Sequence, residues 1–164
     1  MSEYEQARDF EHLSPSERLS ELGITVPEAP PPAAAYIGHV TSGGHLYTAG
    51  QLPLVDGELL ATGLVGDAVD LTSASQCARQ CAINVLAQVK AAGHRMEDIR
   101  RVVKLTVFVA SAPGFTDQHL VANGASEFIG QVFGDAGTHA RSAVGVALLP
   151  LNAPVEIEAM IEVG

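Results

Sequence analysis

The chain has 164 residues, of which 47% are hydrophobic and only 17% are charged. This composition suffices for the core of one domain, and so few charges indicate that another subunit covers part of the surface. With 9 Lys and Arg against 19 Asp and Glu, the chain carries a charge of −10, which repels nucleic-acid backbones and anionic lipid. We therefore expect neither nucleic acid nor a membrane as a partner.

The chain begins with signals for a short helix followed by an extended arm. Residues 14–23 predict the helix, because Ser14 and Glu17 can form a capping box and Gly23 can end it. The proline-rich residues 27–35 exclude regular helix and favour an extended arm that lies over the domain.

These signals predict an N-terminal extension over residues 1–35 and a single domain over residues 36–164. The acidic start lacks the apolar core of a signal or transit peptide, and no stretch approaches the roughly 18 apolar residues of a membrane span. The two cysteines, Cys77 and Cys81, share one helical face, which favours reduced thiols packed in a core over a disulfide or a metal site. By elimination, the expected location is the cytoplasm.

The first half of the domain predicts two short strands and a long helix. The run HVTSGGHLYTAG, residues 39–50, favours a hairpin that turns at residues 42–44. From Ser73 to Ala92 apolar residues recur at helical spacing, and Ser73 with Gln76 resembles a capping box.

The second half predicts a strand, another helix and two closing strands. RVVKLTVFVA, residues 101–110, is β-branched, and residues 139–163 form two apolar runs around a proline-rich turn, as in a hairpin. Asp117 can cap the helix between them, and Gly134 can end it. The order β-β-α-β-α-β-β predicts an α+β fold with two helices packed on one face of a mixed sheet. The apolar face expected for the second helix consists of Leu120, Val121, Ala125, Phe128, Ile129, Val132 and Phe133.

Two charges in the closing strands are candidates for chemistry. Arg141 opens the first strand, and the small residues that continue its face leave room beside a guanidinium whose planar fork suits a carboxylate. His139 shares this face and can line the same pocket. If the two strands pair directly, Arg141 lies near Glu162 and roughly 20 Å from Glu156, so that a site using both draws on two subunits.

Other chemistries find less support in the sequence. The six histidines show neither His-x-His nor His-Glu-x-x-His spacing, so we expect no metal. No Gly-x-Ser-x-Gly elbow and no phosphate-binding glycine motif is present, although a triad assembled in space stays open.

Several motifs resemble one family. HARSAVGVALLPLNAPVEIEA, residues 139–159, is similar to the C-terminal signature of the YjgF/RidA family of enamine and imine deaminases. There, a strand arginine precedes a Leu-Pro turn and a Val/Ile-Glu-Ile-Glu strand. YTAGQLPL and VVKLTVFVA resemble two further strands of the family, so that the likeness covers residues 36–163. The N-terminal extension resembles that of a longer subgroup.

The resemblance implies a chorismate-mutase-like fold and a homotrimer with its sites in clefts between subunits. It also implies hydrolysis of 2-imino or enamine acids to 2-keto acids and ammonia, without a cofactor. Arg141 would then hold the substrate carboxylate, and Glu156 would position or activate the attacking water. Gly50, Asn123 and Tyr36, the last from a neighbouring subunit, match positions that border the pocket.

Two departures from the family pattern keep alternatives open. Ala143 stands where many members have Cys, and Tyr36 is followed by Ile-Gly-His instead of a Ser-containing run. Both reshape the pocket, and they leave open a trimeric protein that binds or responds to keto or imino acids without turnover. A ribonuclease or translation inhibitor is a third interpretation, which the charge of −10 disfavours.

Overall fold

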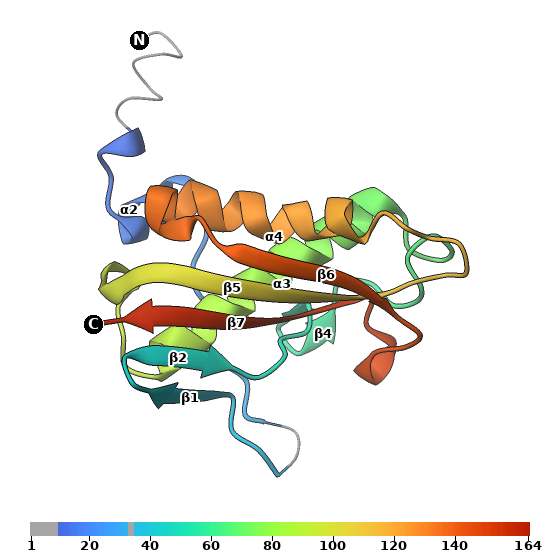
Figure 1. Cartoon of the computed structure of the whole chain (residues 1–164), viewed down its shortest axis with the longest axis horizontal. Coiled ribbons are helices and arrows are strands. Elements are labelled where there is room, and N and C mark those ends of the chain that lie inside the picture. Colours follow the sequence, from blue (N-terminus) through green and yellow to red (C-terminus); the bar gives the residue numbers. More distant parts are fainter. Residues whose placement is uncertain (1–9, 33–34) are drawn as a thin grey trace, which may run out of the picture.

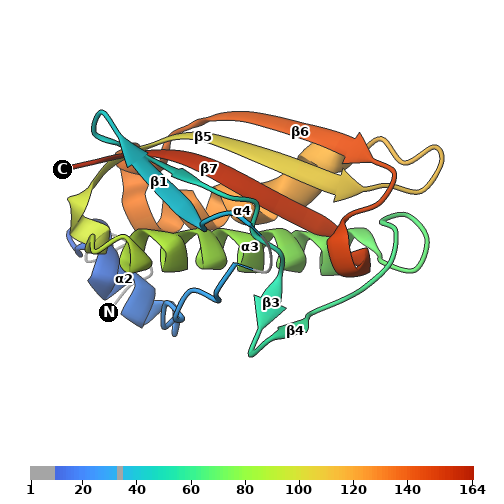
Figure 2. The ribbon, with the colours of Figure 1, turned by 90° about the horizontal axis from the view of Figure 1, so that it is seen from below.

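Five strands form one mixed sheet, and two long helices cover one of its faces (Figures 1 and 2). The computed structural model describes residues 10–32 and 35–164. The strands run in the order β1-β2-β7-β5-β6, and all neighbours are antiparallel except β5 and β6. The strands are β1 His39–Ser42, β2 His45–Thr48, β5 Ile99–Ala110, β6 Ala140–Val146 and β7 Val155–Val163.

The core lies between the sheet and the helices α3 (Leu71–Ala91) and α4 (Gln118–Phe133), which pack against each other (Figure 2). The inward residues of β5 and β7 alternate with residues on the opposite face, which no helix covers. Cys77 and Cys81 are free and buried in this core, as predicted. The predicted α+β class with two helices on one face is thereby confirmed.

The predicted closing hairpin is wrong, because β6 and β7 are not neighbours. β5 lies between them, parallel to β6 and antiparallel to β7. The segment from β5 through α4 to β6 is a crossover connection, which places its two parallel strands side by side. The chain then reverses through the short helix η3 (Pro150–Asn152), where Leu151 and Asn152 adopt φ values of 58° and 61°. β7 consequently pairs on the far side of β5.

The observed register replaces the expected pairing of Arg141 with Glu162. Arg141 is level with Leu105 of β5, which in turn pairs with Ala159, whereas Glu156 pairs with Phe108. The two charged residues are thus three residues apart along the strands and two strands apart across the sheet. Sheet geometry puts their Cα atoms at about 14 Å instead of about 20 Å.

Local helix signals were only partly right. The N-cap of α3 is Asp70, whose Oδ1 accepts the backbone N–H of Ser73 at 2.8 Å, so Ser73 is not the cap. Asp117 occupies the N-cap of α4 as predicted, but its side chain accepts no capping hydrogen bond from the helix. Leu120, expected in the core, is 39% exposed.

The N-terminal helix α2 (Pro15–Glu21) forms as predicted. Ser14 Oγ accepts the N–H of Glu17 at 3.3 Å, Glu17 accepts the N–H of Ser14 at 2.7 Å, and Gly23 follows with φ of 70°. Residues 1–9 and 33–34, which belong to the expected extension, lie outside the described residues.

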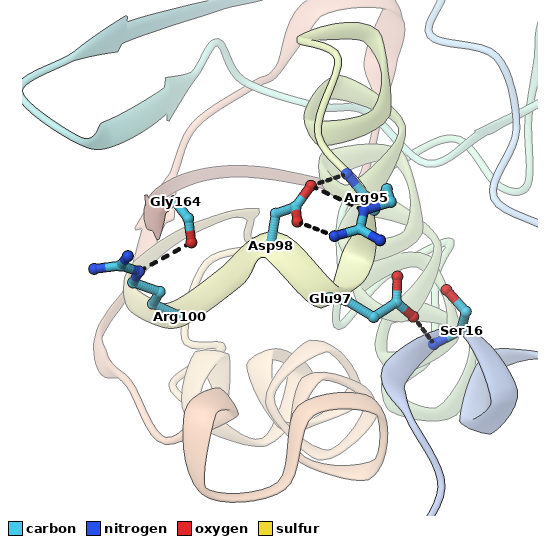
Figure 3. A network of polar contacts seen from close by, with 6 residues as sticks. All are labelled: Ser16, Arg95, Glu97, Asp98, Arg100 and Gly164. Carbon is cyan, nitrogen blue, oxygen red and sulfur yellow. Dashed lines mark hydrogen bonds and ion pairs between the residues drawn. The ribbon is translucent and has the colours of Figure 1, made fainter.

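Polar contacts join α2 and the proline-rich arm to the rest of the structure. The N–H of Ser16 donates to Glu97 at 3.1 Å in the short helix η1 (Met96–Asp98), where Arg95 and Asp98 also pair (Figure 3). An ion pair joins Glu28 of the arm to Lys90 of α3. The arm, α3 and a two-stranded ribbon, β3 (Leu54–Val55) with β4 (Glu58–Leu59), enclose a hollow of about 670 Å³.

Candidate active site

Arg141 lies on the edge strand β6, and its guanidinium rests against α4. Nη1 donates to Oδ1 of Asn123 and to Oγ of Ser126, both at 3.0 Å. Nη2 donates to the carbonyl oxygen of His119 at 3.1 Å. His119, Asn123 and Ser126 follow one another at spacings of four and three residues, so they share one face of the helix. The helical period of α4 therefore builds a cradle for this side chain.

All three groups that hold Arg141 are neutral. Within residues 10–32 and 35–164, no carboxylate forms an ion pair with it. In the same part of the chain, Nε and one proton of Nη2 have no hydrogen-bond acceptor. These two nitrogens share an edge of the planar group, and their spacing matches the two oxygens of a carboxylate. The cradle thus orients a positive charge and leaves one edge available to an anion.

Glu156 lies on the face of the sheet that no helix covers. The alternation of β7 buries Val155 and Ile157 in the core and directs Glu156 and Glu158 to the other face. Burial, together with the negative charge of Glu158, raises the pKa of Glu156 above its ordinary value. A carboxylate with a raised pKa is the stronger base, which suits it to accept a proton from water.

Gly50 is tied to Glu156 by close packing. Any side chain at Gly50 would collide with Oε1 of Glu156. Gln51 keeps Gly50 in place, because its N–H and carbonyl pair with those of Ile157 at 2.8 and 3.0 Å. A larger residue at this position would therefore have to displace the carboxylate end of the flexible Glu156 side chain.

Sequence reasoning missed the polar residues that support Gly50. Gln88 is only 4% exposed, although it is a polar residue of a helix whose apolar stripe faces the core. Its Nε2 donates to Oε1 of Gln51 at 3.3 Å, and its Oε1 lies 3.0 Å from Nδ1 of His39. Gln51 in turn donates to the carbonyl of Ala49 at 3.0 Å. A glutamine at the border of a helical stripe carries no sequence signal that it will turn toward the sheet.

The structure brings the candidate residues into two groups. Arg141 contacts Asn123 on the helix side of the sheet, while Glu156 contacts Gly50 on the other side. Tyr36 precedes β1 at the sheet edge opposite β6, and it is 51% exposed.

Ala143 lies next to Arg141 on the same strand face. It is partly buried and packs against the core. His139, two residues before Arg141, lies on this face as well, and its ring is hydrogen-bonded to Ser126 and Gly137.

Other reactive groups are less suited to chemistry. Burial raises the pKa of Cys77 to about 11 and that of Cys81 well above its ordinary value, so both thiols stay protonated at neutral pH. Residues 10–32 and 35–164 contain no group of three or more His, Cys, Asp or Glu that could hold a metal ion. No helix in the described part of the chain has the length and apolar character needed to cross a membrane.

The sheet, its helix layer and the arginine cradle define a chorismate-mutase-like α+β protein with a candidate anion site at a sheet edge. The sequence model of the family described as Endoribonuclease L-PSP matches residues 26–163. The chain belongs to this family, which is also called YjgF/RidA, as the resemblance indicated. The match begins at residue 26, just before the proline-rich arm, and so earlier than residue 36.

Individual relatives match nearly the whole chain. Protein TCP17 of Trypanosoma cruzi is 48% identical over 88% of this chain and 91% of its own length. A 2-iminobutanoate/2-iminopropanoate deaminase of Salmonella typhimurium is 37% identical over 84% of this chain and 94% of its own length. A crystal structure of a protein of unknown function from Agrobacterium tumefaciens is 52% identical, covers 92% of both chains and superposes with a TM-score of 0.86.

Proposed function

We propose that this protein hydrolyses 2-imino acids and their enamine tautomers to 2-keto acids and ammonia, without a cofactor. The observation that carries this proposal is the Arg141 guanidinium, which neutral groups orient and no described carboxylate neutralises. Kinship with a protein named as a 2-iminobutanoate/2-iminopropanoate deaminase supports the substrate class.

The proposed chemistry needs one cation and one base. Nε and Nη2 of Arg141 bind the substrate carboxylate and fix the imine carbon. Glu156 accepts a proton from a water molecule as the water oxygen adds to that carbon, which yields a carbinolamine. Glu156 then passes this proton to the nitrogen and takes up the proton of the carbinolamine hydroxyl, the C–N bond breaks, and ammonia leaves as the carbonyl of the keto acid forms. The raised pKa of Glu156 favours the first proton transfer.

Both residues act on one substrate only if two subunits contribute to each site. Within one chain, Arg141 lies on the helix side of the sheet and Glu156 on the other side. We propose a homotrimer whose helix-free sheet faces pack together. Exposed apolar side chains on that face support such contacts: Val40, Tyr47 and Val144 are 49%, 41% and 44% exposed.

The remaining candidate residues border the proposed pocket. Gly50 lies against Glu156 and Asn123 accepts a hydrogen bond from Arg141, while Ala143 and a neighbouring subunit's Tyr36 shape the space for the substrate. We also propose an N-terminal extension over residues 1–35 ahead of the domain over residues 36–164. A cytoplasmic location is favoured by two cysteines that remain free.

Mixed trimers test the shared site. We expect Arg141→Ala and Glu156→Gln to be nearly inactive alone, whereas dissociation and reassociation of an equal mixture should restore activity. Random assembly makes about a quarter of the sites intact, since a site needs Arg141 from one subunit and Glu156 from the next. If a mixture that is shown to exchange subunits regains no activity, Arg141 of one subunit and Glu156 of the next do not share a site.

Turnover separates the proposal from its alternatives. An amino-acid oxidase can generate 2-iminobutanoate, and release of 2-oxobutanoate is then timed with and without the protein. A protein that binds 2-oxobutanoate but leaves this rate unchanged is a binding or regulatory protein. The family's description as an endoribonuclease is tested with RNA, for which the charge of −10 predicts no salt-dependent binding.

A further inference from the structure

A chain of hydrogen bonds runs from Arg141 to the backbone through two side chains that the proposed reaction does not use. Nη1 of Arg141 donates to Oγ of Ser126 at 3.0 Å. The same Oγ lies 2.9 Å from Nε2 of His139, and Nδ1 of His139 lies 2.6 Å from the carbonyl oxygen of Gly137.

Only one arrangement of protons satisfies every bond in this chain with a neutral imidazole. The Gly137 carbonyl can only accept, so Nδ1 of His139 carries the proton and Nε2 accepts. The Ser126 hydroxyl must therefore donate to Nε2, which turns a lone pair of Oγ toward Arg141. His139 thus decides the direction in which the Ser126 hydroxyl points.

The far end of the chain is rigidly placed. Gly137 belongs to the short helix η2 (Gly134–Gly137), and a side chain at Gly137 would crowd the carbonyl oxygen of Ile129 at 2.6 Å. The turn is therefore packed directly on α4, which also carries Ser126. The hydrogen bonds of His139 and Ser126 thus connect the backbone of η2 to helix α4 and, through Arg141, to strand β6.

We propose that His139 and Ser126 are positioning residues that set the orientation of the Arg141 guanidinium. With Nη1 committed to Asn123 and Ser126, the edge formed by Nε and Nη2 points to the ligand. This inference rests on the proposed function only in taking a carboxylate as the ligand of that edge. It assigns His139 to orientation, not to proton transfer with the substrate.

Paired variants test the chain of hydrogen bonds. Ser126→Ala removes the hydroxyl that accepts from Arg141, whereas Ser126→Thr keeps a hydroxyl there. His139→Leu removes the nitrogen that accepts from the Ser126 hydroxyl, whereas the amide oxygen of His139→Gln can replace Nε2. We expect Ser126→Ala and His139→Leu to weaken binding of 2-oxobutanoate by about three- to tenfold. Ser126→Thr and His139→Gln should bind 2-oxobutanoate with nearly the affinity of the natural protein.

Two readouts separate orientation from a merely structural role. Binding of the neutral amide of 2-oxobutanoate should change little in any variant, because that ligand lacks the carboxylate. The double variant Ser126→Ala/His139→Leu should lose no more affinity than Ser126→Ala alone, since both changes interrupt one chain. Equal losses for acid and amide, or additive losses in the double variant, would overturn the assignment.

Binding measurements also keep this inference distinct from the proposed reaction. One outcome is that the natural protein binds 2-oxobutanoate with the dependence on Ser126 and His139 described above and yet releases no product. That result refutes the proposed deaminase activity and leaves the orientation role intact. Natural protein that does not bind 2-oxobutanoate refutes both. Nitrogen NMR of the histidines gives a check without any ligand, because His139 should carry its proton on Nδ1, and a proton on Nε2 would refute the chain as drawn.

Discussion

Replacing Arg141 with alanine removes the two donors that the proposed mechanism gives to the substrate carboxylate. Nε and one proton of Nη2 are the donors without an acceptor in the described part of the chain. At about 1.5 kcal/mol for each charge-assisted hydrogen bond, their loss costs about 3 kcal/mol, or about 100-fold in kcat/KM. Water that fills the space recovers part of this, so the loss should be at least about tenfold.

The assay compares a carboxylate ligand with its neutral amide. Arg141→Ala should weaken 2-oxobutanoate binding strongly and the binding of 2-oxobutanamide little, because the amide never made the ion pair. Arg141→Lys should recover only part of the affinity, since a lysine offers a point charge on a different stem. Arg100→Ala is the matched control, because Arg100 is exposed and, among the described residues, its side chain donates only to the carbonyl of Gly164 (Figure 3).

The outcome that refutes this reasoning is an equal loss for acid and amide. Arg141 would then support the fold or a subunit contact instead of holding a carboxylate. Each variant must therefore be shown to be folded and to have the same oligomeric state as the natural protein. Arg100→Ala should leave both affinities unchanged, and a loss there would mean that total charge, not the oriented guanidinium, determines binding.

Glu156→Gln should lower kcat for 2-iminobutanoate while 2-oxobutanoate binding stays nearly intact; equal losses in both would mark a structural residue. The pKa of Glu156 is raised in the folded chain, so the natural protein should lose stability relative to Glu156→Gln as the pH rises from the ordinary carboxyl range through the raised pKa. Urea unfolding of both proteins between about pH 4 and 8 measures this difference in the free energy of unfolding. Light scattering should give a trimer, and the 17.1 kDa monomer at micromolar concentration would contradict it. Chelator treatment should leave turnover unchanged, whereas activity lost to chelator and restored by zinc would show a metal site.

The elements of the fold could be predicted because their signals are local. The capping box at Ser14 and the apolar stripe that contains Cys77 each depend on residues within a few turns, and both were confirmed. The cap of α3 was misplaced because Asp70 and Ser73 are both good capping residues three positions apart, and sequence alone does not rank them.

Strand order could not be predicted in the same way. The runs in β6 and β7 look like a hairpin because they are adjacent in sequence and separated by a proline turn. Their partner β5 ends about 30 residues before β6 begins and about 45 residues before β7 begins, and pairing at such distances leaves no trace in local periodicity. The cradle on α4 was missed for the same reason, since Ser126 meets Arg141 only after β6 has docked beside β5.

The position of Arg141 links subunit assembly to activity in the proposed mechanism. β6 is an edge strand, so Arg141 lies at the rim of the sheet, whereas Glu156 lies two strands further in on the other face. A neighbouring subunit whose helix-free face approaches the β6 edge would bring its own Glu156 toward that guanidinium. Neither residue then has to move within its chain. An isolated chain could unite the pair only by breaking the ladders that join β5 to β6 and β7, and β5 and β7 carry buried residues of the core.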